Sequence, residues 1–303
     1  MEFFDAIANM SALSFVQHMV NGISLGSLYA LIAIGYTMVY GIAKMLNFAH
    51  GDIIMVGSYV VYIAVSSLGL NPILSVVISA IACLVLGVVI EKVAYKPLRH
   101  ASKLAVLITA IGVSYFLQNV ALLIFGANTK SFTSVVPAVS LKLGSLTITA
   151  ETIVTILACV IIMICLTLFI NKTKAGHAMQ AVSEDQDAAQ LMGINVNATI
   201  SLTFAIGSAL AAVAGVLLCS AYPSLTPYTG AMPGIKAFVA AVFGGIGSIP
   251  GALIGGILLG VIEILSKAYI SSQLSDAIVF GVLIVVLVVK PTGILGKVIQ
   301  EKV

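Results

Sequence analysis

The sequence has little charge and no tryptophan. Only 8% of its 303 residues are Asp, Glu, Lys or Arg, whereas 60% are hydrophobic and the mean hydropathy is +1.17. Soluble domains are about 45–50% apolar, so this chain carries more apolar surface than a soluble core can bury. The composition therefore excludes a soluble domain and predicts a polytopic integral membrane protein in contact with the lipid bilayer. A net charge of +3 gives no reason to expect a nucleic acid partner.

Motifs for nucleotide binding and catalysis are also missing. Walker A requires GxxxxGK[ST], and the nearest segment, "GAMPGIKA" at 230–237, lacks both the spacing and the hydroxyl. There is no HExxH, no GxSxG and no paired-carboxylate site. The four cysteines lack CxxC spacing and fall inside apolar runs, which is typical of buried thiols that pack as small apolar side chains. We expect no ATP site, cofactor, metal site or enzymatic activity in this chain.

Long apolar runs predict an all-α bundle of about eight to nine spans. A helix needs about 20 mostly apolar residues to cross ~30 Å of hydrocarbon, and continuous instead of alternating runs argue against a barrel. Six runs are long enough: 16–41, 72–91, 104–125, 152–171, 199–221 and 252–270. Three shorter runs are predicted to be tilted, broken or re-entrant: 52–69, 234–249 and 276–290. The whole chain, 1–303, is predicted to be one transmembrane domain.

Basic residues gather in the segments that this segmentation places on one side of the membrane. Ten of the 14 Lys and Arg residues lie on that side, three lie on the other, and Lys236 falls within a span. The ten are Lys44, Lys92, Lys96, Arg99, Lys103, Lys172, Lys174, Lys290, Lys297 and Lys302; the three are Lys130, Lys142 and Lys267. The positive-inside rule then places the C-terminus inside and the N-terminus outside. The N-terminus, with Glu2 and Asp5, lacks the basic start of a cleaved secretory signal.

The longest segments between spans differ in character. The outer loop 126–151 alternates polar and apolar residues, which predicts a short hairpin. The inner segment 172–198 is hydrophilic, and Ser183 followed by Gln186 fits a capping box that would start a helix over about 184–192. Glu184 and Asp185 would then occupy its first turn, and Gly193 its C′ position. This helix would present a small apolar face, made of Ala181, Val182, Ala188, Ala189 and Met192. It would dock into a groove of a partner, or lie on the protein's own inner face or at the lipid boundary.

Polar residues within or beside the spans are candidates for a transport pathway or gate. Asn47, His50 and Asp52 follow the first span. Asn47 would cap a short helix on the inner face with Asp52 in its first turn, or the three residues would line an inner gate or contact the substrate directly. Tyr29, Tyr36 and Tyr40 recur on roughly one helix face, for packing or for lining a path. Glu263 would pair with Lys267 one turn further on, or serve the pathway. Lys236 and Asp276 lie near predicted outer ends, where snorkelling would explain them.

Small residues suggest close packing and an internal repeat. Gly247, Gly251 and Gly255 are four residues apart and would line one helix face, either for close packing of helix backbones or as part of a flexible gate. Pro250 indicates a turn or a kink. "GSLYALIAIGY" from Gly26 and "GSALAAVAGVL" from Gly207 each begin a long helix followed by a turn and a short segment. The two copies would run in opposite directions, as in the inverted repeats of many transporters.

Four long motifs carry a family resemblance. "NGISLGSLYALIAIGYTMVYGIAKMLNFAHGDIIMVGSY" (21–59), "AVSEDQDAAQLMGINV" (181–196), "KAFVAAVFGGIGSIPGALIGGILLG" (236–260) and "KPTGIL" (290–295) resemble the LivH-type permease subunits of bacterial branched-chain amino-acid ABC transporters. The resemblance covers nearly the whole chain except the outer loop. One departure is that His177 and Gln180 stand where the family usually has arginines.

The resemblance implies a permease subunit of an ATP-driven importer for leucine, isoleucine or valine in the bacterial cytoplasmic membrane. Its partners would be a paralogous second permease, two cytoplasmic ATPases that carry ATP and Mg, and an extracytoplasmic amino-acid-binding protein. The segment 172–198 would couple to an ATPase through Gly176, Ala181, Ser183, Glu184, Asp185, Ala189, Met192 and Gly193. The alternatives are an ion-gradient-driven transporter, a channel-like or structural subunit, and a related permease for urea or short amides.

Overall fold

Six long apolar helices form the body of the protein in a computed structural model, which describes residues 12–99, 101–137, 139–143 and 146–296. They are α2 (Ala12–Ala43), α4 (Pro72–Ile90), α5 (Lys103–Phe125), α6 (Ala150–Lys172), α9 (Val196–Ala221) and α11 (Ile249–Tyr269). A π turn (Glu91–Tyr95) and a 3₁₀ turn (Lys96–Leu98) extend α4. The six runs that were long enough in the sequence are therefore confirmed as membrane-spanning candidates by length and composition.

The three shorter runs form shorter helices. These are α3 (His50–Ser66), α10 (Ala231–Gly244) and α12 (Ser275–Val289). The 14 residues of α10 rise only ~21 Å, less than the ~30 Å of a bilayer core. The prediction that these segments are short is confirmed.

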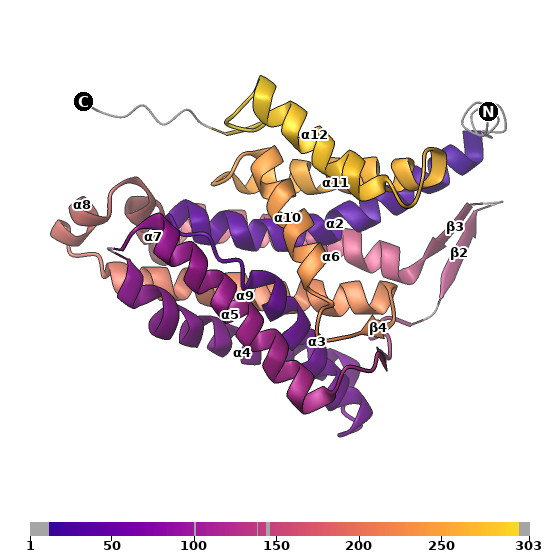
Figure 1. The fold of residues 1–303 in the computed structure, drawn as a ribbon, viewed down its shortest axis with the longest axis horizontal. Coiled ribbons are helices and arrows are strands. Elements are labelled where there is room, and N and C mark those ends of the chain that lie inside the picture. The colour runs from indigo at the N-terminus through magenta and orange to yellow at the C-terminus, as the bar shows by residue number, and fades with distance from the viewer. Residues whose placement is uncertain (1–11, 100, 138, 144–145, 297–303) are drawn as a thin grey trace.

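The helix α2 runs through the centre of the bundle (Figure 1). Every residue from 25 to 39 is buried, because α2 packs against α6, α9, α10 and α11. The peripheral helices instead expose large apolar side chains, such as Ile73 (75% exposed), Leu123 (85%) and Val289 (79%). A soluble protein would carry mainly polar side chains on such a periphery, so these exposed apolar side chains match a surface that faces lipid.

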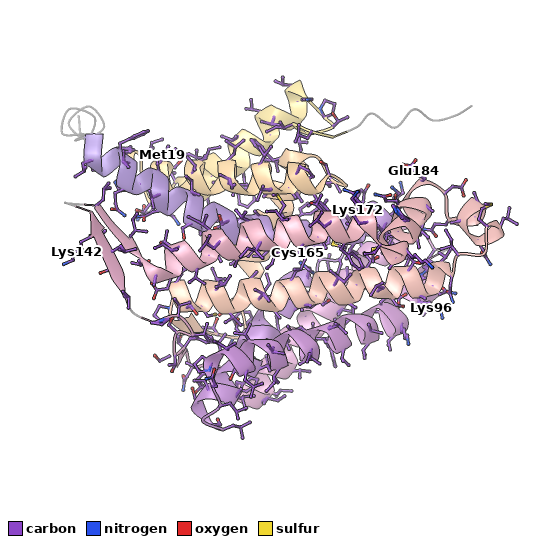
Figure 2. All side chains as sticks on the ribbon, turned by 180° about the vertical axis from the view of Figure 1, so that it is seen from behind. Met19, Lys96, Lys142, Cys165, Lys172 and Glu184 are labelled. Atoms are coloured by element: carbon purple, nitrogen blue, oxygen red, sulfur yellow. The ribbon has the colours of Figure 1, made fainter. Side chains whose placement is uncertain are left out.

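The two ends of the bundle carry different structures (Figures 1 and 2). At one end lie two short helices, α7 (Lys174–Glu184) and α8 (Gln186–Leu191). At the other end β2 (Ser140–Leu143) pairs antiparallel with β3 (Leu146–Thr149), which confirms the hairpin. A second antiparallel pair joins β1 (Lys130–Ser131) to β4 (Ser224–Leu225).

Basic residues from separate inner segments share the end that holds α7 and α8. Figure 2 shows Lys96 and Lys172 at that end with Glu184, and Lys142 at the opposite end. This agrees with the predicted grouping of the charged loops. Glu2, Asp5, Lys297 and Lys302 lie outside the described residues.

Glycines let α11 approach its neighbours closely. An ideal Cβ on Gly251 would lie 2.5 Å from the Gly244 carbonyl oxygen, and one on Gly255 would lie 2.2 Å from that of Ala240, so α10 and α11 pack backbone to backbone. The expectation for Gly247 on the same helix face is wrong. It lies in the turn before α11 with φ +96°, because the helix begins only at Ile249, with Pro250 in its first turn.

Replacing Gly251 with leucine should therefore lower the thermal stability of the protein. The added side chain would overlap α10, and overpacking typically costs about 1–3 kcal/mol or more. The control is Gly112→Leu on α5, because nothing lies within 4 Å of a Cβ there. Fluorescence-detected size-exclusion chromatography after heating would measure both variants, and equal melting temperatures would contradict the packing.

The cysteines are free thiols, and three of the four are buried. Cys83, Cys159 and Cys219 lie in the interior, as expected for small apolar side chains. Cys165 is exposed on α6, contrary to the expectation of burial for all four. The reason is that α6 is a peripheral helix whose outer face would contact lipid.

Candidate functional site

The segment 172–198 folds into the pair α7–α8 between α6 and α9. Thr173 caps α7, since its hydroxyl oxygen accepts a hydrogen bond from the Gly176 N–H at 3.0 Å. A Cβ on Gly176 would lie 2.3 Å from the Ile170 carbonyl oxygen, so only glycine allows the sharp turn from α6 into α7. The start of the segment is thereby fixed against the end of α6.

The predicted capping box at Ser183 is wrong. The helix α7 continues through Ser183 to Glu184, and the Ser183 hydroxyl donates to the Gln180 carbonyl at 2.7 Å. Asp185 caps α8 instead, because its extended backbone lets one carboxylate oxygen accept from the N–H groups of Asp187 and Ala188, both at 2.9 Å. Gly193 follows α8 with φ +83°, as expected for a C′ glycine.

The pair α7–α8 has one buried face and one exposed tip. Met179, Val182 and Ala189 are buried, at 0%, 1% and 4% exposed, against the body of the protein. Ala181 is half-buried beside them. Leu191 and Met192 are instead 88% and 83% exposed, so the expectation of a single apolar face that includes Met192 is wrong. The end of α8 turns Met192 outward, away from the side on which Ala189 packs.

The exposed tip combines apolar and acidic side chains. Leu191 and Met192 lie beyond the acidic residues Glu184, Asp185 and Asp187, all of which are exposed. Two large apolar side chains in water at the end of a short helix are a typical anchor for a partner groove, and the carboxylates favour a groove with basic residues. The geometry suits docking by the tip while the opposite face stays fixed to the bundle.

The stretch between α2 and α3 returns into the interior of the protein. Lys44 turns the chain with φ +56°, after which Asn47 and His50 are 2% and 1% exposed. The His50 imidazole lies over Gly35, where a Cβ would be 2.5 Å from Nε2. Gly35 precedes the end of α2 by eight residues, or ~12 Å, so α3 begins well inside the bundle. The expected capped turn on the inner face is therefore wrong.

Asn47 does not cap α3. The N-cap position is Ala49, without a side-chain hydrogen bond, whereas the Asn47 amide oxygen accepts from the Tyr95 hydroxyl at 2.9 Å. Asp52 does lie in the first turn of α3, as expected, and accepts a hydrogen bond from the Gln118 amide at 2.8 Å. These contacts tie the re-entrant stretch to the π turn after α4 and to α5.

Removing the Tyr95 hydroxyl should destabilise the protein. Tyr95→Phe would leave the buried Asn47 amide oxygen without its partner, at a cost of about 1–3 kcal/mol. Tyr115→Phe on α5 is the matched control, since that ring is 62% exposed. Melting temperatures in detergent would show the difference, and an unchanged Tyr95→Phe variant would argue against this contact.

The short helices α3 and α10 meet at their N-termini. A Cβ on Gly230 would lie 1.7 Å from the Gly51 carbonyl oxygen, and one on Gly234 would lie 2.8 Å from the Gly51 Cα. The long helices before them, α2 and α9, run in opposite directions and touch where Gly207 faces Gly35 (Figure 1). The opposed directions of the two predicted copies are thus confirmed, and both broken helices start in the same interior region.

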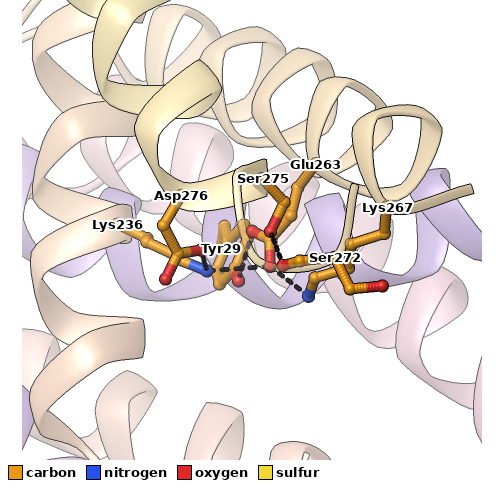
Figure 3. Close-up of polar contacts among 7 residues, drawn as sticks. All are labelled: Tyr29, Lys236, Glu263, Lys267, Ser272, Ser275 and Asp276. Atoms are coloured by element: carbon orange, nitrogen blue, oxygen red, sulfur yellow. Dashed lines mark hydrogen bonds and ion pairs between the residues drawn. The ribbon is translucent and has the colours of Figure 1, made fainter. Parts of the chain in front are cut away.

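An ionic network centred on the buried Glu263 lies between α2, α10, α11 and α12 (Figure 3). Lys267 and Lys236 both donate to Glu263 Oε1, at 2.6 and 2.8 Å, which confirms the Glu263–Lys267 pair. Tyr29 donates to the other oxygen, Oε2, at 2.8 Å. Lys236 also pairs with Asp276 at 2.7 Å. Snorkelling does not explain Lys236, which is 6% exposed and paired with two carboxylates, the buried Glu263 and the part-exposed Asp276.

The tyrosines of α2 point to different neighbours. Tyr29 reaches the Glu263 network, whereas the Tyr36 ring packs edge-on against His50, with centroids 4.6 Å apart. Tyr40 is only half-buried. The structure therefore brings Tyr36, His50 and Asn47 into one interior region and Tyr29 with Glu263 into another.

The comparison with known proteins decides the family. A family model described as "Branched-chain amino acid transport system / permease component" matches residues 18–287. The high-affinity branched-chain amino acid transport system permease protein LivH of Salmonella typhimurium is 48% identical over 96% of this chain and 98% of its own length. The chain belongs to this permease family. LivH of Escherichia coli K12 and BraD of Pseudomonas aeruginosa, both named as permease proteins of the same kind of system, are 47% and 46% identical. No solved structure matches.

Membership in the branched-chain permease family makes this a multi-pass membrane subunit of a transport system and not a member of a catalytic family. Among the described residues, no group of His, Cys, Asp and Glu side chains has the geometry of a metal site. The functional question is then which residues of this permease touch partners and which touch the transported molecule.

Several structural partners could not be identified from the sequence. Glu91 is fully buried, accepting hydrogen bonds from Arg99 and from Ser201, the latter at 2.6 Å. Gln118 and Tyr95 hold the re-entrant stretch. The sequence offered one signal for the buried Glu91–Arg99 pair: Glu91 is a carboxylate near the end of an apolar run and precedes Arg99 by eight residues.

Proposed function

We propose that the chain is the transmembrane permease subunit of an ATP-driven importer of branched-chain amino acids in the bacterial cytoplasmic membrane. The observation that carries this proposal is the match to LivH and BraD over 95–96% of the chain, since both are named for high-affinity transport of these substrates. The N-termini of the short helices α3 and α10, which meet in the interior, support a transport pathway there.

The energy would come from partner subunits. The chain has no Walker A motif, so ATP and Mg would bind to two cytoplasmic ATPases and not to this permease. A paralogous second permease would complete the transmembrane unit, and an extracytoplasmic binding protein would deliver the amino acid. The tip of α7–α8, with Leu191, Met192 and the acidic residues, is the proposed contact with an ATPase cleft.

The buried face of α7 supports a role in coupling. Met179 and Val182 are packed among α2, α6 and α9, so a force on the exposed tip would move these helices as a unit. The helix α9 in turn packs on α2, α3 and α4. A rigid displacement of α7–α8 would therefore reach the re-entrant stretch through packed elements, as in other hinge and shear motions.

The proposed orientation follows the positive charges. The end with α7, α8, Lys96 and Lys172 would face the cytoplasm, and the end with the hairpin β2–β3 would face outward. The N-terminus would then be outside and the C-terminus inside. Accessibility of single cysteines at positions 140 and 191 to a membrane-impermeant thiol reagent in intact cells would establish the sides.

Reconstitution tests the function. The permease, co-expressed with its partner permease and ATPases and supplied with the binding protein, should take up leucine into liposomes only when ATP is present on the ATPase side. Leucine uptake by this chain alone, driven by a proton or sodium gradient, would overturn the proposal.

A second candidate function is secondary transport driven by an ion gradient. The opposed pairs α2–α3 and α9–α10, together with the buried Glu263, are features that such transporters also show. The same liposome assay separates the two functions. Competition by urea or a short amide would test the related permease specificity.

A further inference from the structure

We propose that a pocket beside the Glu263 network is a contact site for the transported amino acid, which it holds by both charged groups and by the aliphatic side chain. This inference rests on the proposed function, because it assigns a substrate site to the proposed importer. The pocket lies near β4, at the end of the bundle that carries the hairpin β2–β3.

The pocket is open and has a volume of about 320 Å³. This is near the lower limit of the roughly 300–1,000 Å³ typical of small-molecule sites and suits a single amino acid. Its lining comes from α2, α9, α10 and α11 and the segment between α9 and α10, and consists of Leu25, Tyr29, Leu218, Tyr222, Ser224, Thr226, Thr229, Pro233, Glu263 and Lys267.

One wall of the pocket carries opposite charges side by side. Among the described residues, Lys267 donates only to Glu263, so two of its three N–H bonds are free to reach a carboxylate in the pocket. Within the described part of the chain, Glu263 Oε2 accepts a hydrogen bond from Tyr29 alone and retains a lone pair for an ammonium group. An amino acid zwitterion presents these two complementary groups two bonds apart, and charge-assisted hydrogen bonds are among the strongest available to it.

The other walls suit an aliphatic side chain. Leu25 and Leu218 are 5% and 7% exposed and, with Pro233, add apolar surface to the pocket lining. The remaining groups are hydroxyls, of which Thr226 and Thr229 already bond to each other at 3.2 Å. Among the residues that the structure describes, no further charged side chain lines the pocket, so a substrate side chain with its own charge would lie there without a partner.

The ionic network has a second half that does not line the pocket. Lys236 and Asp276 pair at 2.7 Å on the far side of Glu263 (Figure 3). Asp276 therefore provides a matched control. Its substitution removes one charge from the same network without changing the pocket, whereas substitution of Lys267 changes both.

Protection from thiol labelling tests the site directly. Ser224 is exposed and lines the pocket, so the labelling rate of a Ser224→Cys variant reports on occupancy. The experiment uses the assembled complex in nanodiscs, with Cys165→Ser as background because Cys165 is exposed. Ser140→Cys in the hairpin β2–β3 is the site control. The probes are L-leucine, L-leucinamide without the carboxylate, and 4-methylpentanoate without the ammonium.

Leucine should slow labelling of Ser224→Cys and leave labelling of Ser140→Cys unchanged. Leucinamide and 4-methylpentanoate should need at least about tenfold higher concentrations, since each lacks one charge-assisted hydrogen bond. Adding Lys267→Gln should weaken the effect of leucine by a similar factor, and adding Asp276→Asn should not. The proposed site would be contradicted if leucine gave no protection, or if the three probes protected equally. It would also be contradicted if Lys267→Gln and Asp276→Asn changed the protection by leucine to the same extent.

Uptake measured on the same complex separates this inference from the proposed function. If the complex takes up leucine with ATP but leucine does not protect Ser224→Cys from labelling, the pocket is not a substrate site, while the proposed importer function still holds. Absence of ATP-dependent uptake by the complete complex would overturn the importer itself.

Discussion

Replacing both Glu184 and Asp185 with lysine should reduce retention of ATPase subunits by the solubilised permease at least about tenfold, which corresponds to about 1.4 kcal/mol of binding free energy. Both side chains are exposed at the tip of α7–α8, beside Leu191 and Met192. Reversal would turn an attraction to a basic cleft into repulsion, and loss of the Asp185 N-cap would loosen α8 by a further ~1 kcal/mol. Leucine uptake should fall with retention.

A second double variant separates the effect of the negative charges from the effect of the helix N-cap at position 185. Glu184→Gln with Asp185→Asn removes both charges, while asparagine remains a good N-cap, so α8 should stay folded. We expect this variant to retain ATPase subunits to an extent between those of the unmodified permease and the lysine double variant, and this retention should not depend on salt concentration. Glu151→Lys at the start of α6, which lies at the opposite end of the bundle, should leave retention unchanged. Normal co-purification of ATPases with the lysine double variant would contradict docking through this tip.

The membrane spans were predictable because one strong physical constraint decides them. A helix that crosses lipid needs a long, uncharged apolar run, and in the described part of the chain all six such runs form helices long and apolar enough to span a membrane. The three shorter runs were predictable as short for the same reason. Length and composition do not specify where in the bundle a short helix begins. For this reason the burial of His50 was not predicted from the sequence.

Local capping signals competed with one another. Ser183 and Gln186 fit a capping box, yet Asp185 two residues later caps the helix with two hydrogen bonds. Both patterns are valid locally, and burial of Val182 on α7 decides between them by favouring continuation of the first helix to Glu184. A similar competition applies to Asn47, whose amide serves Tyr95, 48 positions away, instead of α3.

Long-range ion pairs were only partly predictable. The Glu263–Lys267 pair follows from a spacing of one helical turn. The pairing of Lys236 with Glu263 joins α10 to α11, and periodicity within one helix carries no information about it. The pocket likewise forms only when four helices meet.

The second large effect is expected at Glu263. Glu263→Met should destabilise the protein by about 3–5 kcal/mol, because it would leave the buried Lys236 ammonium with Asp276 alone and remove the acceptor of Tyr29 and Lys267. The expected result is a large fall in the melting temperature in detergent and poor recovery of the assembled complex.

The double variant Glu263→Met with Lys236→Met distinguishes a missing charge from a damaged fold. It removes both buried charges, and replacement of a whole ion pair by apolar side chains of similar size is often neutral or stabilising. Asp276, whose side chain is 45% exposed, can then be solvated. We therefore expect most of the lost stability to return, while leucine transport stays impaired because the pocket lacks its carboxylate. Recovery of transport together with stability would show that Glu263 has a structural role only.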